Sequence, residues 1–377
     1  MDKFSLRRAV ERLRDGLFDP VAVNCLTVES NHIGNAFSKG LKAVEKGSAD
    51  SLCICGSYGQ GKSHTLTYLN QSALSQGYAT SVVQLDLREV PFYQFSIIYQ
   101  SIMEKLTLPD GRKFGQAWKE WADTNSLECL ESMPHRFKMI LTAMLCKNKR
   151  LTPKESTLKK HQTYRPKEFG YWLEQALMGY DLPLAHLKAV CKYREVENYR
   201  KQSLLIRGND AYFQMVQSLG KVLKEMGYNG LLLFFDEAES ITQGRLNHRV
   251  KSYQLLDQFF EAKSFVFPIF AFTDDFFTKV NQESYDDEKQ TFSKNYAEAW
   301  RNLNVVRLQD FTSQGWDSLL DRLLRLYAQA YQVELSQPIK SSLHAVLRKV
   351  EAQETRLKLK ALVNKLDIET QHILLSA

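Results

Sequence analysis

The segment GSYGQGKS at residues 56–63 constrains this chain more than any other feature, because it fits the pattern G-x-x-x-x-G-K-[ST] at every fixed position. A short apolar run of strand type, SLCICG, leads into the segment, and a helical pattern, KSHTLTYLNQSALSQG, follows it. Glycines allow backbone N–H groups to curl around an anion, and a helix that begins at Lys62 adds the positive end of its dipole. The segment therefore predicts a phosphate-binding loop rather than an ordinary glycine-rich turn.

The residue types in this loop predict how ATP and Mg²⁺ are bound. Lys62 is expected to reach the β- and γ-phosphates, and the Ser63 hydroxyl is expected to ligate Mg²⁺. His64 follows on the helix behind the loop, where we expect a structural role rather than a catalytic one. The expected nucleotide-binding residues of the loop are Gly56, Ser57, Tyr58, Gly59, Gln60, Gly61, Lys62, Ser63 and His64.

A strand that ends in acidic residues is the second part of the expected site. In GLLLFFDEAES, five apolar residues precede Asp236 and Glu237, so a buried strand would carry Asp236 to the sheet edge beside the loop. Asp236 would hold Mg²⁺ through water, and Glu237 would act as the general base on the attacking water. Alone, this pattern also fits a strand end before a helix; paired with the loop, it favours ATP hydrolysis. Thr273, after the run FVFPIFAF, either contacts the γ-phosphate or attacking water or begins a turn.

Strands and helices alternate on both sides of a long helical stretch, which predicts a parallel sheet with crossover helices. The expected strands lie at residues 51–56, 78–87, 231–236, 264–273 and 304–311. The predicted fold is an α/β P-loop NTPase, a three-layer αβα sandwich with a parallel sheet, a large helical insertion and an all-helical C-terminal lid. The expected segments are an N-terminal helical segment at 1–46, the ATPase core at 47–106 and 210–311, a basic helical insertion at 107–209, and the lid at 312–377.

Composition excludes membrane and small disulfide-rich classes of protein. Of the 377 residues 44% are hydrophobic, enough for a core, yet the longest apolar runs are far too short to span a bilayer. The first residues, MDKFSLRRAVERLRDGLF, lack the apolar core of a signal peptide, so we expect a cytoplasmic protein. The six scattered cysteines fit reduced thiols, and the eight histidines lack the spacing of a metal site.

Several stretches of the sequence resemble the ATP-binding proteins of BREX phage-defence systems, which belong to the AAA-type ATPases. The similar stretches are GSYGQGKSHTL, GYNGLLLFFDEAES, RVKSYQLLDQFF, FTDDFF and AWRNL, in that order, together with RRAVERLRDGL near the start and ETRLKLKALVNKLD near the end. The resemblance covers most of the chain and fails across residues 107–209. It implies an anti-phage ATPase that works with other defence-system proteins and forms homo-oligomers when ATP is bound.

The resemblance also implies roles for residues outside the loop. Thr273 would occupy the sensor-one position, and Arg301, in YAEAWRNL, would be offered to the nucleotide of a neighbouring subunit. Arg356, in the helical lid, resembles the second sensor arginine. The chain departs from the family here, because the common Thr-Pro-Arg start of this helix reads Glu-Thr-Arg. For Arg301 and Arg356 the alternative is a solvated arginine on a helix.

One segment holds the positive excess of the chain. The net charge is +7, and residues 136–167 contain ten Lys or Arg against one Asp or Glu. Phe137 and Tyr164 lie within this segment, from Arg136 to Lys167, and Phe169 lies just beyond it. The segment is therefore a candidate for double-stranded DNA, with cations on phosphates and aromatic rings on bases. The alternatives are a solvated basic face, or the attraction of an acidic protein partner.

Three functions fit these residues. The first is a motor that hydrolyses ATP to act on DNA or DNA–protein complexes in phage defence. The second is a switch, in which nucleotide binding controls oligomerisation or recruitment of effector proteins with little turnover. The third is a scaffold that has lost catalysis. The presence of Lys62, Ser63, Asp236 and Glu237 argues against the third and does not separate the first two.

Overall fold

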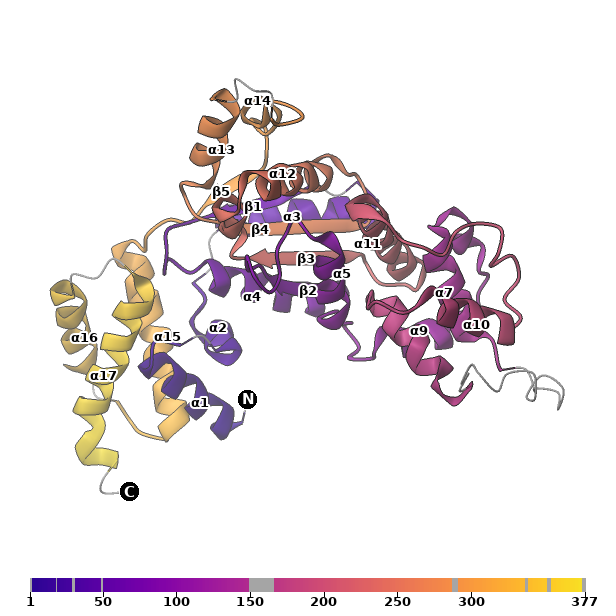
Figure 1. The fold of residues 1–377 in the computed structure, drawn as a ribbon. Coiled ribbons are helices and arrows are strands. Elements are labelled where there is room, and N and C mark those ends of the chain that lie inside the picture. Colours follow the sequence, from indigo (N-terminus) through magenta and orange to yellow (C-terminus); the bar gives the residue numbers. More distant parts are fainter. Residues whose placement is uncertain are drawn as a thin grey trace.

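The five predicted strands form one parallel sheet, in the order β2-β3-β4-β1-β5 (Figure 1). They are β1 (Leu52–Cys55), β2 (Ala79–Gln84), β3 (Leu231–Asp236), β4 (Val266–Phe272) and β5 (Val305–Arg307). The structure is a computed structural model that describes residues 2–17, 19–28, 31–48, 50–148, 166–286, 291–335, 338–350 and 354–374. Strand β4 lies between β1, which enters the phosphate loop, and β3, which ends at Asp236, so the ends of all three strands share one sheet edge.

Helices cover both faces of the sheet, which confirms the predicted three-layer fold. They are α3 (Asn31–Glu45) and α4 (Lys62–Ser75) on one face, and α5 (Phe95–Glu104), α11 (Gly208–Glu225) and α12 (Leu246–Glu261) on the other. Successive strand residues point to opposite faces. Accordingly, Leu232 and Phe234 pack in the apolar cluster of α3 and α4, while Leu233 and Phe235 pack in that of α5, α11 and α12.

The insertion is helical in its described part, as predicted. Its elements are α6 (Phe114–Ala122), the 3₁₀ turn η1 (Glu128–Ser132), α7 (His135–Leu145), the 3₁₀ turn η2 (Pro166–Glu168), α9 (Phe169–Met178) and α10 (Leu184–Tyr193). Their apolar side chains belong to the same buried cluster as α5 and α11, so the insertion extends one layer of the ATPase core. In Figure 1 it lies at the end of the sheet away from the C-terminal helices.

A second helical unit has a core of its own and joins the two ends of the chain. We call it the lid module: α1 (Lys3–Arg14), α2 (Pro20–Leu26), α15 (Ser313–Tyr331), α16 (Pro338–Lys349) and α17 (Thr355–Leu374). Leu6 and Val10 of α1 pack with Leu320 and Leu323 of α15 in an apolar cluster to which no described sheet residue belongs. The expected N-terminal segment is therefore divided, since α1 and α2 join the lid module while α3 covers the sheet (Figure 1).

Two short helices that the sequence did not predict, α13 (Phe276–Tyr285) and α14 (Tyr296–Ala299), connect β4 to β5. They carry an aromatic cluster in which Tyr296 and Trp300 pack against Tyr253 of α12.

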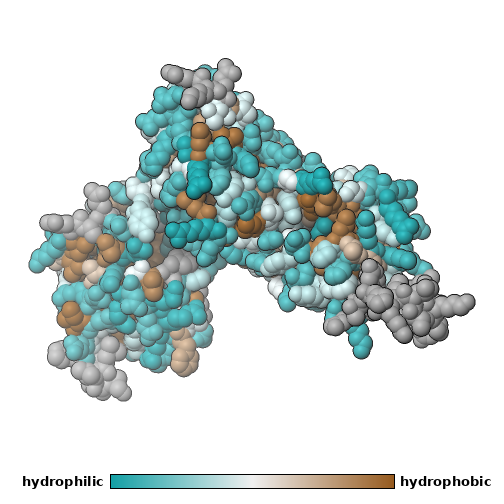
Figure 2. All heavy atoms as spheres, viewed as in Figure 1, coloured by the Kyte–Doolittle hydropathy of each residue, from teal (hydrophilic) through white to brown (hydrophobic). Residues whose placement is uncertain are grey.

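Figure 2 shows that the face turned to the viewer is largely hydrophilic, with scattered hydrophobic side chains. Within the described part of the chain, no helix has the length and apolar character needed to cross a membrane.

Candidate nucleotide-binding site

The phosphate loop connects β1 to α4 and leaves the first turn of α4 open to a ligand. Gly61 is the N-cap residue of α4, with φ 106°, and no side chain caps the N–H groups that follow it. A Cβ added at Gly61 would meet no atom within 4 Å, so the backbone there is accessible. Uncapped N–H groups at a helix start, together with the helix dipole, form an anion site.

Lys62 is buried and its ammonium group lies at the base of the loop. Its Nζ donates to the carbonyl oxygens of Gly56 at 3.0 Å and of Ser57 at 3.3 Å. A carboxylate oxygen of Glu239 lies 3.8 Å from the same Nζ. The lysine is thus held beside the open N–H groups, as a phosphate-binding lysine requires.

Asp236 and Glu237 lie at the end of β3, where the sequence predicted them. The backbone N–H of Glu237 donates to Oδ1 of Asp236 at 3.0 Å. Glu237 adopts a left-handed backbone conformation, with φ 56° and ψ 34°, which costs a residue with a side chain roughly 1–2 kcal/mol. Such strain is common at functional sites. Burial raises the pKa of Glu237, the charge of Asp236 adds to the rise, and the charge of Lys62 opposes it.

The end of β4 carries Thr273 and a residue that we did not predict, Asp274. Thr273 is half-buried, and its carbonyl accepts from the N–H of Phe276, so it also begins the turn into α13. Asp274 accepts from the Ser57 hydroxyl at 2.8 Å and pairs with Arg307 at 3.2 Å. Asp274 therefore ties the phosphate loop to β5. The signal was present in the sequence, since polar residues that follow a buried strand lie at the same edge as Thr273.

Gln60 and His64 connect the loop to its surroundings through neutral groups. Gln60 accepts from the backbone N–H of Ser57 at 2.8 Å and donates to Asp310, beyond β5, at 3.0 Å. The His64 ring hydrogen-bonds to the Thr27 hydroxyl, at the end of α2, at 2.8 Å. Burial lowers the pKa of His64 to about 4, so the ring is neutral near pH 7. These contacts fit the structural role expected of His64.

The lid module reaches the phosphate loop at the start of α17. The Arg356 guanidinium lies over the Tyr58 ring, 5.6 Å from its centroid, and 3.6 Å from a carboxylate oxygen of Glu354. The Glu354 side chain lies so close to Gly59 that a Cβ there would be 2.8 Å from Glu354 Cγ. Gly59 has φ +74°, so glycine is required at this position both for the backbone and for the approach of the lid.

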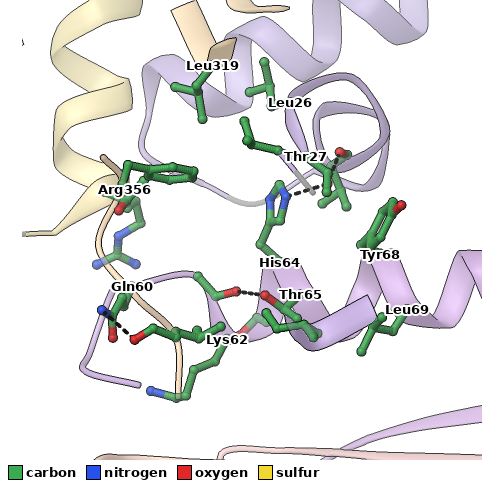
Figure 3. A pocket seen from close by; sticks show the side chains of 18 of the residues that line it. Leu26, Thr27, Gln60, Lys62, His64, Thr65, Tyr68, Leu69, Leu319 and Arg356 are labelled. Carbon is green, nitrogen blue, oxygen red and sulfur yellow. Dashed lines mark hydrogen bonds between the residues drawn. The ribbon is translucent and has the colours of Figure 1, made fainter. Parts of the chain in front are cut away.

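The loop, the lid module and α3 enclose a cavity of about 1000 Å³. Its lining includes Tyr58, Gly59, Gln60, Gly61, Lys62, Ser63, His64, Glu237, Arg356, Leu26, Phe37 and Leu319. In Figure 3, Lys62, Gln60 and Arg356 lie at one end of the cavity, and Leu26 and Leu319 lie at the other. The polar end, beside the start of α4, suits the phosphates of a nucleotide, and the apolar end suits its base.

Arg301 lies outside this cavity. It is exposed in the turn after α14 and lines a separate hollow of about 560 Å³ with His32 and Arg307. Of the described residues that line the large cavity or the hollow, Gln309 alone lines both. The structure thus brings together Lys62, Glu237 and Arg356, and leaves Arg301 on the surface.

Comparison with protein families places this chain in a known group. The sequence profile of the BREX system ATP-binding protein BrxC/D family matches residues 3–124 and 190–375, which is most of the chain. The chain belongs to this family. The BREX match runs further into the insertion than the resemblance suggested, since it omits residues 125–189 rather than the whole of 107–209.

Other comparisons add less than the BREX family match. A Walker-type ATPase from Pyrococcus abyssi is similar in structure, with a TM-score of 0.35 and 12% sequence identity. The similarity covers 92% of this chain and 74% of that one. A comparison with curated proteins gave no match.

The part of the insertion that the BREX family match omits includes the basic segment, and the structure corrects one prediction there. Phe137 and Phe169 are fully buried, so the prediction that their rings stack on bases is wrong. Arg136 is also turned inward, donating to the carbonyl of Leu204 at 3.1 Å. The sequence contained the reason, because Phe137 occupies one apolar face of α7 with Ile140, Leu141 and Met144 at helical spacing. Tyr164 and residues 149–165 lie outside the described residues.

Proposed function

We propose that this BREX-family ATP-binding protein hydrolyses ATP to ADP and phosphate and acts in phage defence with other proteins of the system. The observation that carries the proposal is the convergence of Lys62, Glu237 and Arg356 on one cavity, from the loop, the end of β3 and the lid module. The cavity combines an open helix start, a buried cation, a half-buried carboxylate and an apolar end. These groups suit a nucleotide and a reaction at its terminal phosphate.

Ser63 and Asp236 suit a site for Mg²⁺ that is completed by ATP and water. Such a cation would be held by one hydroxyl, by one carboxylate through water, and by phosphate oxygens. Mg²⁺ bound there would neutralise charge on the β- and γ-phosphates.

Glu237 is the proposed general base. It would accept a proton from water as the water oxygen attacks the γ-phosphorus and the bond to the β–γ bridging oxygen breaks. Its raised pKa, caused first by burial and then by Asp236, favours proton acceptance. Lys62 would hold the phosphates, and Thr273, at the end of the strand between β1 and β3, would orient the γ-phosphate or the water.

We further propose that ATP joins copies of the chain into homo-oligomers. Arg301 is exposed and lines a hollow separate from the cavity of its own chain, which supports a role at the site of a neighbouring copy. Arg356 would contact the nucleotide of its own chain. The contact of the lid module with the loop also supports the second candidate, a switch in which the bound nucleotide controls the lid and effector recruitment.

ATP turnover by the purified protein, with and without double-stranded DNA, tests these proposals. We expect Mg²⁺-dependent turnover in the unmodified protein, loss of nucleotide binding in Lys62→Ala, and binding without turnover in Glu237→Gln. Strong stimulation by DNA favours the motor, whereas slow turnover that ignores DNA, with an oligomeric state that follows the nucleotide, favours the switch. Unchanged turnover in Glu237→Gln would remove that residue from its role.

A further inference from the structure

Glu239 is a buried carboxylate that the roles above do not use. It lies in the 3₁₀ turn η3 (Ala238–Gln243), three residues after Asp236, and only 8% of its surface is exposed. Its Oε2 is buried and has no hydrogen-bond partner among the described protein atoms. A buried carboxylate is costly unless it is paired, so its presence at this site requires an explanation.

Lys62 is the cation that Glu239 faces. The Glu239 Oε1 lies 3.8 Å from Lys62 Nζ. The same ammonium group also donates to the carbonyls of Gly56 and Ser57. The two side chains, taken without their backbone atoms, are 8% exposed for Lys62 and 11% exposed for Glu239, so water screens their attraction weakly. Burial raises the pKa of Glu239, and the charges of Glu237 and Asp236 add to the rise. Its own backbone N–H and the charge of Lys62 oppose it.

The local backbone fixes Glu239 in this orientation. The turn η3 follows Glu237, whose left-handed conformation redirects the chain directly after β3. The Thr242 hydroxyl then donates to the carbonyl of Glu239 at 3.0 Å. Glu237 and Glu239 are two positions apart in the sequence. The same turn therefore presents Glu237 to the cavity and places Glu239 beside Lys62.

We propose that Glu239 is a positioning residue, an internal counter-ion that holds the Lys62 ammonium group at the base of the loop until nucleotide phosphates displace it. Phosphate oxygens and the Glu239 carboxylate compete for one ammonium group, so Glu239 lowers nucleotide affinity and keeps the loop ordered without a ligand. The inference rests on the proposed nucleotide binding at Lys62. It does not require hydrolysis.

A double-mutant cycle on the ligand-free protein tests the pairing. In the unmodified background, Glu239→Gln should lower the melting temperature by roughly 2–4 °C, because the pair is lost. In the Lys62→Ala background the same change should raise the melting temperature, because it removes a buried carboxylate without a partner. Equal shifts in both backgrounds would overturn the pairing. Glu298→Gln, which changes an exposed carboxyl group of α14, is the matched control and should have no effect in either background.

Binding of a fluorescent ADP analogue with Mg²⁺ tests the competition. Glu239→Gln should raise affinity on the order of fivefold, since Lys62 is released to the phosphates. Glu239→Asp keeps the negative charge, so its affinity for the ADP analogue should stay near that of the unmodified protein. A purely structural role of Glu239 would not predict that the charge decides the affinity. An affinity that is unchanged or reduced in Glu239→Gln would overturn the counter-ion role. If the unmodified protein binds no nucleotide, the proposed function fails, while the melting cycle still reports whether the pair exists.

Discussion

The lid module and the insertion are both helical additions to the same sheet, but they are attached in different ways. The insertion shares the buried cluster of α5 and α11, and it is bound there by buried hydrogen bonds such as that from the Tyr99 hydroxyl to the Leu177 carbonyl at 2.8 Å. The lid module has its own core, and it meets the phosphate loop through Arg356, Glu354 and the Thr27–His64 hydrogen bond.

This difference has a consequence for how nucleotide binding can be transmitted. A unit with its own core can open at a lower cost in free energy than a unit that shares a core, because the second moves only with that core. The close approach at Gly179, where a Cβ would lie 2.6 Å from Tyr99 Cδ1, shows how tightly the insertion is fitted. We therefore expect nucleotide to change the position of the lid module and to leave the insertion fixed on the sheet.

The largest expected effect comes from the insertion core. Phe169→Ala removes a fully buried ring that packs on Trp172 and Tyr193, with ring centroids 5.4 Å and 5.7 Å away. It should lower the free energy of unfolding by about 3–5 kcal/mol. Because the cluster is continuous with the sheet layer, segment-resolved hydrogen exchange should show faster exchange in β3 and α11 as well as in α9.

Tyr171→Ala is the control for this change, since it removes a ring on the same helix that is 61% exposed. It should leave both stability and exchange nearly unchanged. Faster exchange that stays within α7, α9 and α10 in Phe169→Ala would show that the insertion unfolds by itself, and the contrast with the lid module would be lost.

A smaller effect is expected inside the lid module. Asp367 accepts from Arg14 through both carboxylate oxygens, at 2.6 Å and 3.0 Å, and also from the Tyr327 hydroxyl at 2.8 Å. Asp367→Ala should destabilise this unit by about 1–2 kcal/mol, because charged hydrogen bonds are lost at a partly exposed site. Hydrogen exchange should quicken in α1, α15 and α17 and stay unchanged in the sheet. Asp15→Ala, at an exposed carboxylate near Arg14, should have no such effect; exchange that spreads into β1 or β3 would contradict a separate lid core.

The sequence was sufficient to predict the sheet and to place the phosphate loop and the end of β3 at one sheet edge, for a physical reason. Each strand of a parallel sheet is buried on both faces and reads as a continuous apolar run, as at Leu231–Asp236, and the loop motif specifies backbone and side chain together. These signals are local in the chain. Each can be read without knowing what packs against it.

What the sequence did not predict depends on contacts between distant residues. The apolar face of α1 is visible in the sequence, but nothing local states that Val10 packs with Leu323 rather than on the sheet. Phe137 was misassigned because its cationic neighbours Arg136 and Lys138 were given more weight than its helical spacing with apolar residues of α7. Glu239 was missed because its role comes from the strained turn after β3. The position of Asp274 at the sheet edge could be read from the sequence, but its contacts with Ser57 and Arg307 depend on the order of the strands.

The smallest expected effect is at the contact between the lid module and the phosphate loop. Arg356→Ala should lower ATP affinity by about fivefold, since one cation at the polar end of the cavity is lost. The free energy of unfolding of the ligand-free protein should change by less than about 1 kcal/mol, because Arg356 and the Tyr58 ring that it contacts are both exposed. Titration with ATP and with ADP, alongside denaturant unfolding, measures both quantities. Arg348→Ala, at an exposed arginine of α16, is the matched control. A change in stability without a change in affinity would make Arg356 a structural residue of α17, and the lid module would then lack its proposed contact with nucleotide.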